Sequence, residues 1–455
     1  MTIDDRSTTW LNHVEALASA SPESPGGLYD LASEIFPICR SITGEGVRLT
    51  LAKLASLTSG LEVRAVPSGT QCFDWFVPDE WTIRGAYIIG PSGEKIIDFS
   101  DNNLHVVGYS VAVDTVLPLD ELQTHLHSIP ELPNAIPYVT SYYERTWGFC
   151  LTQRQRDTLT PGNYRAVVDS TLAPGVLNYG EIVIAGRSRR EILLSTYVCH
   201  PSMANNEVSG PVLAAFLARW IERLPSREFS YRILFVPETI GAIAYLSTHR
   251  DALRSKVVAG FILTCVGDDR TYSFLPSRLG GTLADRVAEH VLRHHAPSFD
   301  RYTFLDRGSD ERQYCSPGVD LPVVSMMRSK YSTYPEYHTS LDDLSVISES
   351  GFAGAFEAHA KLVLALERNT IYQAVHPCEP QMSRHGLYRT LGTRSRPADT
   401  RGMMNLLAYA DGSIDLIGIA DALGQPVELC DRWARPLLRA SLLRVSAAET
   451  AAHAS

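Results

Sequence analysis

Residues 191–224 read EILLSTYVCHPSMANNEVSGPVLAAFLARWIERL, and this stretch decides the fold class. Its first part, EILLSTYV, has the apolar and β-branched composition of a buried strand. Its last part, SGPVLAAFLARWIERL, has apolar residues at helical spacing, and Ser209 is placed to cap that helix. Between them lies the polar stretch CHPSMANNEVSG. The pattern predicts a strand, a polar loop at its carboxyl end, and then an amphipathic helix.

The same alternation of strand and helix continues to about residue 330. The strand-like runs YRILFV, VVAGFILTCV and LPVVSMM are separated by helical patterns near residues 240–248 and in TLADRVAEHVLRHH. Such alternation predicts a doubly wound α/β fold, with a mostly parallel sheet and helices on both of its faces. Sites in these sheets form at the carboxyl ends of the strands, so the polar loops there are the first candidates for function.

The residue pattern of the sequence changes on either side of this segment. Residues 61–164 consist of short β-rich pieces, such as CFDWFVP and GAYIIGPSG, which predict an antiparallel β unit. From residue 379 an Arg- and Pro-rich connector leads into three helical patterns that match a small winged-helix or helix-turn-helix module. We assign residues 1–60 and 165–378 to the α/β domain, 61–164 to the β-rich unit and 379–455 to the winged-helix module.

The composition argues against several classes of protein. The chain has 455 residues, 45% hydrophobic and 20% charged, and no apolar run reaches the roughly 20 residues of a membrane-spanning helix. A net charge of -10 argues against a mainly nucleic-acid-binding or membrane-surface protein, since both usually carry a basic excess. The eight cysteines form no CxxC pair and the start MTIDDRSTTW has no signal-peptide pattern, so we expect a cytoplasmic protein with reduced thiols.

Titratable residues of the kind that bind metal follow the predicted strands. His200 and Glu207 follow the first strand, Glu238 follows YRILFV, and His338 lies in YPEYHTSLDDL. Zinc hydrolases need two or three imidazole or carboxylate ligands, an open position for water, and a carboxylate that takes a proton from that water. His200, Glu207 and His338 qualify as ligands, and Glu238 as the base. Each role has a simpler alternative. His200 could be a loop histidine that only forms hydrogen bonds to the backbone, and Glu238 could only interact favourably with the dipole of the helix that follows it.

Candidate substrate-binding residues lie in two further loops. The stretch RGSDERQYC contains Asp310, Glu311 and Arg312, and Arg328 follows the strand LPVVSMM. The two carboxylates can hold a substrate ammonium group, and either arginine a carboxylate. A structural salt-bridge cluster is the alternative. Three tryptophans of the β-rich unit are candidates for the walls of a substrate pocket: Trp75, Trp81 and Trp147. For each of them, packing in the core is the alternative role.

Several long motifs resemble the aminopeptidase-like family of bacterial proteins, which is related to the zinc aminopeptidases. The motifs are CHPSMANNEVSGP, FVPETIGAIAYL, GDDRTYSFLPSR, DRGSDERQYCSPGVDLP and YPEYHTSLDDL, and FPICRSITGEGVR and YYERTWGFC extend the match to about residues 27–445. The resemblance implies an α/β domain of zinc-aminopeptidase type, with the β-rich unit inserted into it and a winged helix at the C-terminus. It also implies that His200 and His338 bind metal and that Glu238 is the general base.

The sequence departs from the two-zinc aminopeptidases at carboxylate positions. The Asp that bridges two metals in the motif D-N-x-S-G falls on Asn206, the second residue of a Glu pair falls on Thr239, and a later Asp falls near Thr264. Asp268 or Asp269, slightly further on, is an alternative source of the last carboxylate. Fewer carboxylates leave too little negative charge for two divalent ions, so we expect one zinc ion rather than two.

The sequence therefore predicts a zinc-dependent amide or peptide hydrolase, with the metal held by His200, Glu207 and His338. Glu238 would act as general base on zinc-bound water, and the substrate would be a small peptide or an acylated amino compound. Two alternatives stay open. One is a binding or regulatory protein that uses the winged helix, and the other is an amide-forming or acyl-transfer enzyme with the same site.

We expect the chain to form a homo-oligomer, such as a dimer, and to have no membrane partner. A nucleic-acid partner is not expected either, since arginines at intervals of three to five usually form a solvated helix face. The arginines interpreted in this way on the last predicted helix are Arg432, Arg435, Arg439 and Arg444.

Overall fold

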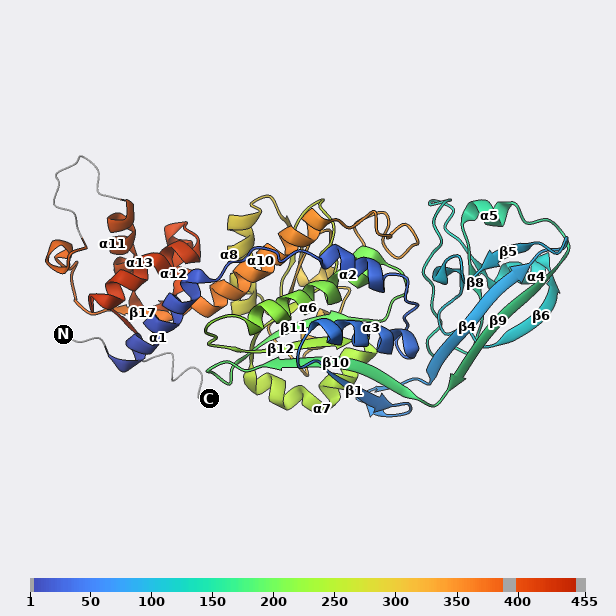
Figure 1. Ribbon diagram of the computed structural model, residues 1–455, viewed down its shortest axis with the longest axis horizontal. Helices are drawn as coiled ribbons and strands as arrows, with labels where there is room; N and C mark the ends of the chain where they lie inside the picture. Colours follow the sequence, from blue (N-terminus) through green and yellow to red (C-terminus); the bar gives the residue numbers. More distant parts are fainter. Residues whose placement is uncertain (1–3, 388–397, 447–455) are drawn as a thin grey trace.

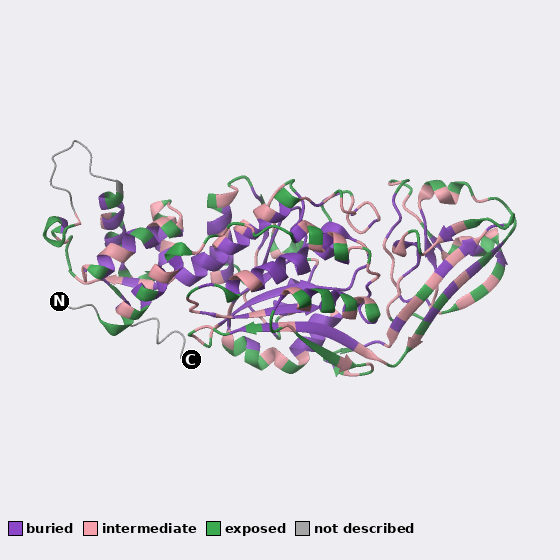
Figure 2. Cartoon of the chain, viewed as in Figure 1, coloured by how far each residue is buried: buried purple, intermediate pink, exposed green. Residues whose placement is uncertain are grey.

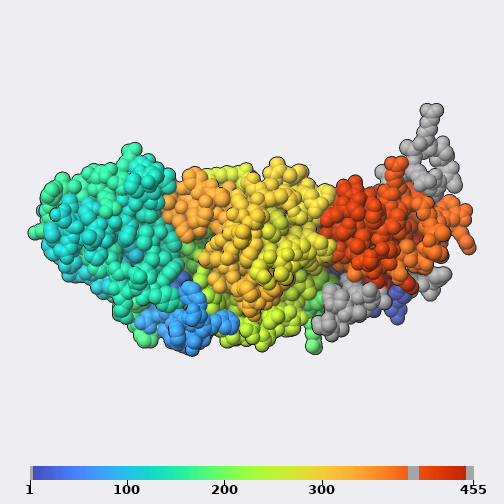
Figure 3. Space-filling view, turned by 180° about the vertical axis from the view of Figure 1, so that it is seen from behind, coloured from blue at the N-terminus to red at the C-terminus, as the bar shows by residue number. Residues whose placement is uncertain are grey.

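The computed structural model describes residues 4–387 and 398–446, which form an elongated molecule of three parts (Figure 1). The α/β domain lies in the centre, between the winged-helix module at one end and the β-rich unit at the other; Figure 3 shows the same order from behind. The predicted α/β architecture with a mostly parallel central sheet is confirmed. None of the helices in the described ranges combines the length and the apolarity that crossing a membrane requires.

The core of the molecule is an eight-stranded sheet in the order β1-β10-β12-β11-β13-β16-β14-β15. Its four central strands, β12, β11, β13 and β16, are parallel, whereas β1, β10 and β14 each run antiparallel to a neighbour. The strand bounds are β1 (Glu62–Pro67), β10 (Val176–Ile184), β11 (Glu191–Tyr197), β12 (Ser230–Val236), β13 (Val257–Ile262), β14 (Ser273–Leu275), β15 (Asp300–Arg301) and β16 (Val323–Met327).

Helices cover both faces of this sheet because its central strands are apolar on both sides (Figure 2). All seven residues of β11 are buried; Ile192 and Leu194 pack on one face, and Leu193 and Tyr197 on the other. The helices of the first face are α2 (Leu28–Ile35), α3 (Glu45–Leu57), α6 (Ser209–Glu222), α8 (Leu283–His295) and α10 (Glu349–Arg368). Those of the second face are α7 (Ile240–Lys256) and α9 (Glu311–Tyr314).

The start of α6 differs from the sequence prediction. A π-helical turn over Ala204–Val208 runs directly into the helix, so Ser209 is the first helical residue. The hydroxyl of Ser209 donates to the carbonyl oxygen of Asn205 at 2.5 Å, and the prediction that Ser209 caps α6 is therefore wrong. Turns of this kind often mark functional sites. This one buries Asn205, Asn206 and Glu207 at the carboxyl edge of the sheet.

The β-rich unit is built around a four-stranded antiparallel sheet in the order β5-β4-β9-β6. Its boundaries differ from the expected range 61–164, since β1 pairs with β10 in the central sheet and β9 continues to Ala173. The elements are β2 (Gln71–Cys72), β3 (Trp75–Phe76), β4 (Glu80–Ile89), β5 (Lys95–Asp98), β6 (Val113–Pro118), α4 (Leu119–Leu122), β7 (Leu126–His127), β8 (Phe149–Cys150), α5 (Gln153–Asp157) and β9 (Asn163–Ala173).

The winged-helix module combines three helices with a three-stranded antiparallel sheet in the order β18-β17-β19. Strand β17 begins at Ile371, so the module starts before residue 379, where we expected it. Arg444 lies in β19 and not on the last helix, which corrects the sequence interpretation. The elements are β17 (Ile371–Ala374), α11 (Ala398–Tyr409), β18 (Asp411–Asp415), α12 (Leu416–Leu423), α13 (Val427–Arg439) and β19 (Leu443–Val445).

Helix α13, the last helix of this module, is covered by other parts of the same chain. The N-terminal helix α1 (Asp5–Ala16) packs against α13 and β19, and α10 packs against α13 as well. Arg439 of α13 forms an ion pair with Glu15 of α1. Within α13, Arg435 pairs with Asp431. Arg439 is nevertheless exposed, as the sequence predicted, with 59% of its side chain in solvent, whereas the Arg435 side chain is only 15% exposed.

Candidate metal and catalytic site

The adjacent parallel strands β11 and β12 bring His200 and Glu238 together at their carboxyl ends. His200 Nε2 lies 3.6 Å from Glu238 Oε2. The His200 residue is 2% exposed, and the side chain of Glu238 is 19% exposed. The two groups are thus shielded from bulk water and close enough to act on one small molecule between or beside them.

Glu207 contacts the other nitrogen of the same imidazole. His200 Nδ1 lies 2.7 Å from Glu207 Oε2, and the backbone N–H of Cys199 donates to Glu207 Oε1. Burial opposes a charge on His200, but the charge of Glu207 and its hydrogen bond outweigh burial and raise the pKa of His200. A carboxylate on one ring nitrogen fixes the orientation of a histidine and leaves the other nitrogen free to bind metal. The structure thus places Glu207 behind His200, on the side away from Glu238.

A second grouping of potential ligands uses His200 Nδ1 itself. Ligand atoms of Cys199, His200 and Glu207 all lie within 4.8 Å of one another, and Cys199 Sγ is 3.2 Å from His200 Nδ1. Within residues 4–387 and 398–446 this is the only such cluster of three His, Cys, Asp or Glu side chains. Burial raises the pKa of the Cys199 thiol well above its usual range, so the thiol is protonated in the metal-free protein.

His338 lies across from His200, with 5.4 Å between the ring centroids. Two imidazoles on one tetrahedral zinc have centroids about 5 Å apart, given Zn–N bonds of about 2.0–2.1 Å. Burial, with a further contribution from His200, lowers the pKa of His338 to about 3, so its imidazole is neutral, as a metal ligand must be. The spacing and protonation of the two histidines fit a shared metal ion.

The β-rich unit holds the loop that carries His338. The backbone N–H of Tyr138 donates to the carbonyl oxygen of His338 at 2.9 Å, and that of Ser340 donates to Ile136 at 2.8 Å. The Tyr138 ring lies 5.0 Å from the His200 ring and 5.3 Å from the His338 ring. Its hydroxyl is 3.1 Å from that of Tyr142. Neither tyrosine stands out in the sequence as a site residue, although Tyr142 begins the motif YYERTWGFC.

Neutral side chains occupy two of the three positions at which the resemblance to the two-zinc aminopeptidases implies carboxylates. Asn206 Nδ2 donates to the Tyr197 hydroxyl at 2.9 Å, and this hydroxyl is 2.6 Å from that of Thr264. Asn206 Oδ1 is buried and has no hydrogen-bond partner among the described residues. A buried acceptor of this kind usually has a ligand or a water molecule as its partner. Asn206 thus offers an uncharged acceptor at this edge, where a carboxylate would bring a negative charge.

Asp268 and Asp269, the alternative carboxylates, are engaged elsewhere. Asp268 accepts hydrogen bonds from Asn205 Nδ2 at 2.9 Å and from the backbone and hydroxyl of Ser329 at 3.0 and 2.9 Å. Asp269 accepts from the hydroxyls of Ser348 and Ser350 at the start of α10. Both aspartates therefore tie loops together and do not supply the missing carboxylate.

Two of the four predicted substrate-binding residues lie beside Glu238. Asp310 Oδ1 accepts from the backbone N–H of Thr239 at 2.8 Å, while its Oδ2 is buried without a partner among the described residues. Arg312 donates to the Thr239 hydroxyl at 3.1 Å and lies 3.8 Å from Glu238 Oε1, with its side chain 40% exposed. These two side chains therefore lie next to Glu238, one of them buried and the other partly exposed.

The other two predicted residues serve different contacts. Glu311 is fully buried and accepts from the backbone N–H groups of Gly308 and Ser309 and from the Tyr331 hydroxyl. The Arg328 guanidinium stacks over the Tyr272 ring at 4.0 Å. Glu311 thus belongs to a structural polar cluster, which was the alternative to substrate binding. Arg328 contacts Tyr272 instead of Glu238.

Glu238 and Asp310 are among the carboxyl groups at this edge that have raised pKa values. Burial is the main cause for Glu238, against the opposing effects of His200 and Arg312. Burial, followed by the charge of Glu238, raises the pKa of Asp310 well above its usual range. Thr239, which connects the two, has a left-handed backbone with φ of +63°, an uncommon conformation that concentrates at functional sites. A raised carboxyl pKa is what a general base that also donates a proton requires.

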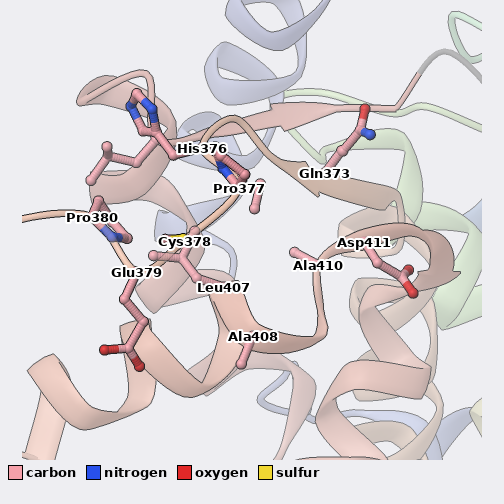
Figure 4. A pocket seen from close by; sticks show the side chains of 12 residues that line it. Gln373, His376, Pro377, Cys378, Glu379, Pro380, Leu407, Ala408, Ala410 and Asp411 are labelled. Carbon is pink, nitrogen blue, oxygen red and sulfur yellow. The ribbon is translucent and has the colours of Figure 1, made fainter.

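A different cavity, of about 360 Å³, lies in the winged-helix module (Figure 4). Its potential metal or proton ligands, His376, Glu379 and Asp411, point in different directions in this view. They do not converge as the side chains at the sheet edge do. The candidate site is therefore the carboxyl edge of the central sheet.

The fold and this edge define the class of protein: an aminopeptidase-like α/β domain with a β-rich insertion and a C-terminal winged helix. Residues 29–369 match the family described as a domain of unknown function, DUF4910, and the chain belongs to that family. Residues 370–445 match a winged helix-turn-helix family. The predicted resemblance to aminopeptidase-like proteins is confirmed.

The most informative relatives come from Clostridium acetobutylicum. A protein described as "Putative polysaccharide biosynthesis protein with aminopeptidase-like domain" is 43% identical over 427 residues, which is 93% of this chain and 98% of the relative. The crystal structure of a "putative peptidase" has a TM-score of 0.86 at 40% identity, over 96% of this chain and 98% of that chain. A zinc aminopeptidase from Bacillus subtilis shares the fold alone, with a TM-score of 0.54 at 10% identity over 81% of this chain and 96% of that chain.

Proposed function

We propose that the protein is a zinc-dependent amide hydrolase that works with one metal ion. The supporting observation is that His200 Nε2, His338 and Glu238 converge at one sheet edge, while Glu207 occupies His200 Nδ1. His200 and His338 would hold the ion. Glu207 would orient His200, in place of the direct ligand role that the sequence predicted. The uncharged Asn206 also favours one ion over two.

When bound, a zinc ion supplies Lewis-acid activation of the attacking water and of the amide carbonyl. Glu238 takes a proton from the water and delivers it to the leaving nitrogen, while the amide C–N bond breaks and the acyl carbon gains the water oxygen. Asp310, with its unpaired buried oxygen, would hold an ammonium or N–H group of the substrate. The half-exposed Arg312 would bind a carboxylate or carbonyl oxygen beside Glu238.

The substrate we favour is an acylated amino compound, and within that class an N-acyl amino sugar. Support comes from the Clostridium relative, which is described as a polysaccharide biosynthesis protein. A small peptide is the second candidate, because the zinc aminopeptidase of Bacillus subtilis shares the fold. An amide-forming or acyl-transfer reaction would use the same groups in the reverse direction.

The test is metal quantification followed by a substrate screen. The purified protein should contain one zinc per chain and should cleave members of a panel of amino-acid amides, N-acyl amino acids and N-acyl amino sugars. Cleavage should stop with a chelator and return with zinc. Metal-free protein with chelator-resistant activity, or with no cleavage anywhere in the panel after zinc addition, would contradict the proposal.

A regulatory role through the winged helix is the second candidate, and the packing of α13 argues against it. Helices α1 and α10 cover α13, and Arg439 is paired with Glu15. A helix in this position cannot enter a DNA groove unless α1 first moves away. Salt-dependent binding of the full chain to duplex DNA would favour the regulatory role.

We also propose a cytoplasmic location. None of the eight cysteines forms a disulfide, and six of them are buried. Unpaired cysteines in this number are usual where thiols stay reduced. Fractionation of the native host should find the protein in the cytoplasmic fraction.

A further inference from the structure

A cavity of about 270 Å³ lies where the β2–β3 hairpin meets α7. Ile243 of α7 lines the cavity one helical turn beyond Thr239. Gln313 also lines it and directly follows Arg312, which lies 3.8 Å from Glu238. Figure 3 shows the hairpin, in blue, at the junction of the β-rich unit and the α/β domain. The cavity therefore begins one helical turn from Thr239, which follows the proposed general base Glu238 in the chain.

The hairpin and Tyr143, which contacts it, present aromatic side chains to solvent, and two of these residues, Phe73 and Trp75, line the cavity. The exposed fractions are 47% for Phe73, 40% for Trp75, 52% for Phe76 and 49% for Tyr143. Trp75 and Tyr143 meet edge to face at 6.0 Å, and the Tyr143 hydroxyl donates to the carbonyl oxygen of Phe76 at 2.9 Å. Exposed aromatic residues gathered in one place usually mark a binding surface. We call these four residues the aromatic patch.

Two features show that the aromatic patch is held in place. Phe73 has a left-handed backbone, with φ of +57°, which costs conformational energy in a bulky residue. Tyr143 follows Tyr142, whose hydroxyl is 3.1 Å from that of Tyr138 above the two histidines. The chain therefore connects the patch directly to Tyr142, whose hydroxyl lies next to that of Tyr138.

Polar side chains line the same cavity between the aromatic faces and the apolar side of α7. Asp74 and Arg250 contribute one charge of each sign, and Gln313 and Ser316 contribute neutral hydrogen-bonding groups. Among the described residues, the side chains of Asp74 and Gln313 form no hydrogen bond. A ligand that suits this lining is neutral, has a ring that can pack on an aromatic face, and carries several hydroxyl groups.

We propose that this cavity binds a sugar ring of the substrate. The apolar face of a pyranose would pack on Trp75, and its hydroxyls would bond with Asp74, Arg250 and Gln313. The volume lies near the lower end of the roughly 300–1,000 Å³ of small-molecule sites, which suits one or two rings better than a long peptide. This inference rests on the proposed function, because it names the carrier of the amide that Glu238 would cleave.

The experiment measures binding of N-acetylglucosamine to the full chain carrying Glu238→Gln, which removes turnover. Calorimetry or ligand-observed NMR should show saturable binding. Adding Trp75→Ala should weaken it about tenfold, Trp75→Phe should restore most of the loss, and Gln313→Ala should weaken it as well. Leu305→Ala serves as the matched control, because Leu305 is 84% exposed and lies outside the patch.

Two results would overturn the sugar subsite. One is no saturable binding of N-acetylglucosamine; the other is equal binding by the Trp75→Ala and Leu305→Ala variants. N-acetylleucine amide is the apolar comparison ligand, and a larger loss for it than for the sugar in Trp75→Ala would also contradict the proposal. Failure of the hydrolase proposal looks different: sugar binding would persist while the wild-type chain held no zinc and cleaved no amide.

Discussion

The sheet-edge site and the joint between the α/β domain and the winged helix both contain shielded carboxyl groups, but these have different partners. At the joint, Arg286 of α8 donates to both oxygens of Asp415, at 2.8 and 2.6 Å. At the sheet edge, Asp310 accepts one backbone hydrogen bond and its second oxygen is unpaired. The two aspartates show how one residue type serves two purposes.

The pKa values of the two aspartates move in opposite directions. Burial opposes the charge of both, but hydrogen bonds from Arg286 and Asn369 outweigh it and lower the pKa of Asp415. At Asp310, burial and the neighbouring Glu238 raise the pKa. A carboxylate paired with arginine stabilises the joint, whereas a carboxyl group without such a partner can bind a proton or a ligand.

The largest expected effect is on catalysis at the sheet edge. Glu238→Gln removes the proposed base while keeping its shape, so kcat/KM for a cleaved amide should fall about a thousandfold. Zinc content and unfolding midpoint should stay unchanged. Glu34→Gln, on an exposed glutamate of α2, is the control and should retain full activity. Substantial turnover by the Glu238→Gln protein would remove this residue from the mechanism.

The next effect concerns Glu207 as the residue that orients His200. Glu207→Gln should weaken zinc binding by about 10–100-fold, because the histidine loses its carboxylate partner but remains a ligand. Chelator competition measures this affinity. Cys199→Ser should leave zinc binding nearly unchanged. If Cys199→Ser abolishes binding, the ion sits on His200 Nδ1 with Cys199 and Glu207 instead.

At the joint, the expected effect is on stability alone. Arg286→Ala should lower the free energy of unfolding by about 1 kcal/mol, a value discounted because the arginine side chain is 39% exposed. Urea denaturation measures the change, and activity should stay at the wild-type level. Arg84→Ala removes an exposed pair with Asp169 and should cost less stability than Arg286→Ala. Equal losses in the two variants would show that the joint gains nothing from its burial.

The smallest expected effect is the pH dependence of the stability that Arg286→Ala removes. Because the folded-state pKa of Asp415 is lowered, its pairing stabilises the protein above the unfolded pKa of about 3.9 and is lost as pH falls through the folded value. The difference in unfolding free energy between wild type and Arg286→Ala should therefore be constant near neutral pH and shrink below about pH 4. A difference that grows in acid would contradict the assignment to Asp415.

The sequence was sufficient for the elements that depend on local pattern. Buried strands alternating with helices predicted the central sheet, and parallel strands next to each other necessarily place His200 and Glu238 at one edge. Local pattern could not show that a π-helical turn directs Glu207 toward His200 Nδ1, since a shift of one residue decides which side chain faces the ring. It also could not separate Arg312 from Arg328, or place Tyr138, because those contacts depend on packing between distant segments.

The most direct test of the central claim is zinc content per chain in the wild type and in His338→Ala, measured by mass spectrometry after exhaustive dialysis. We expect one equivalent in the wild-type protein and almost none in His338→Ala, with the fold retained by circular dichroism. Two equivalents, both needed for activity, would contradict the one-metal site. One equivalent retained by His338→Ala would contradict the pairing of His200 with His338.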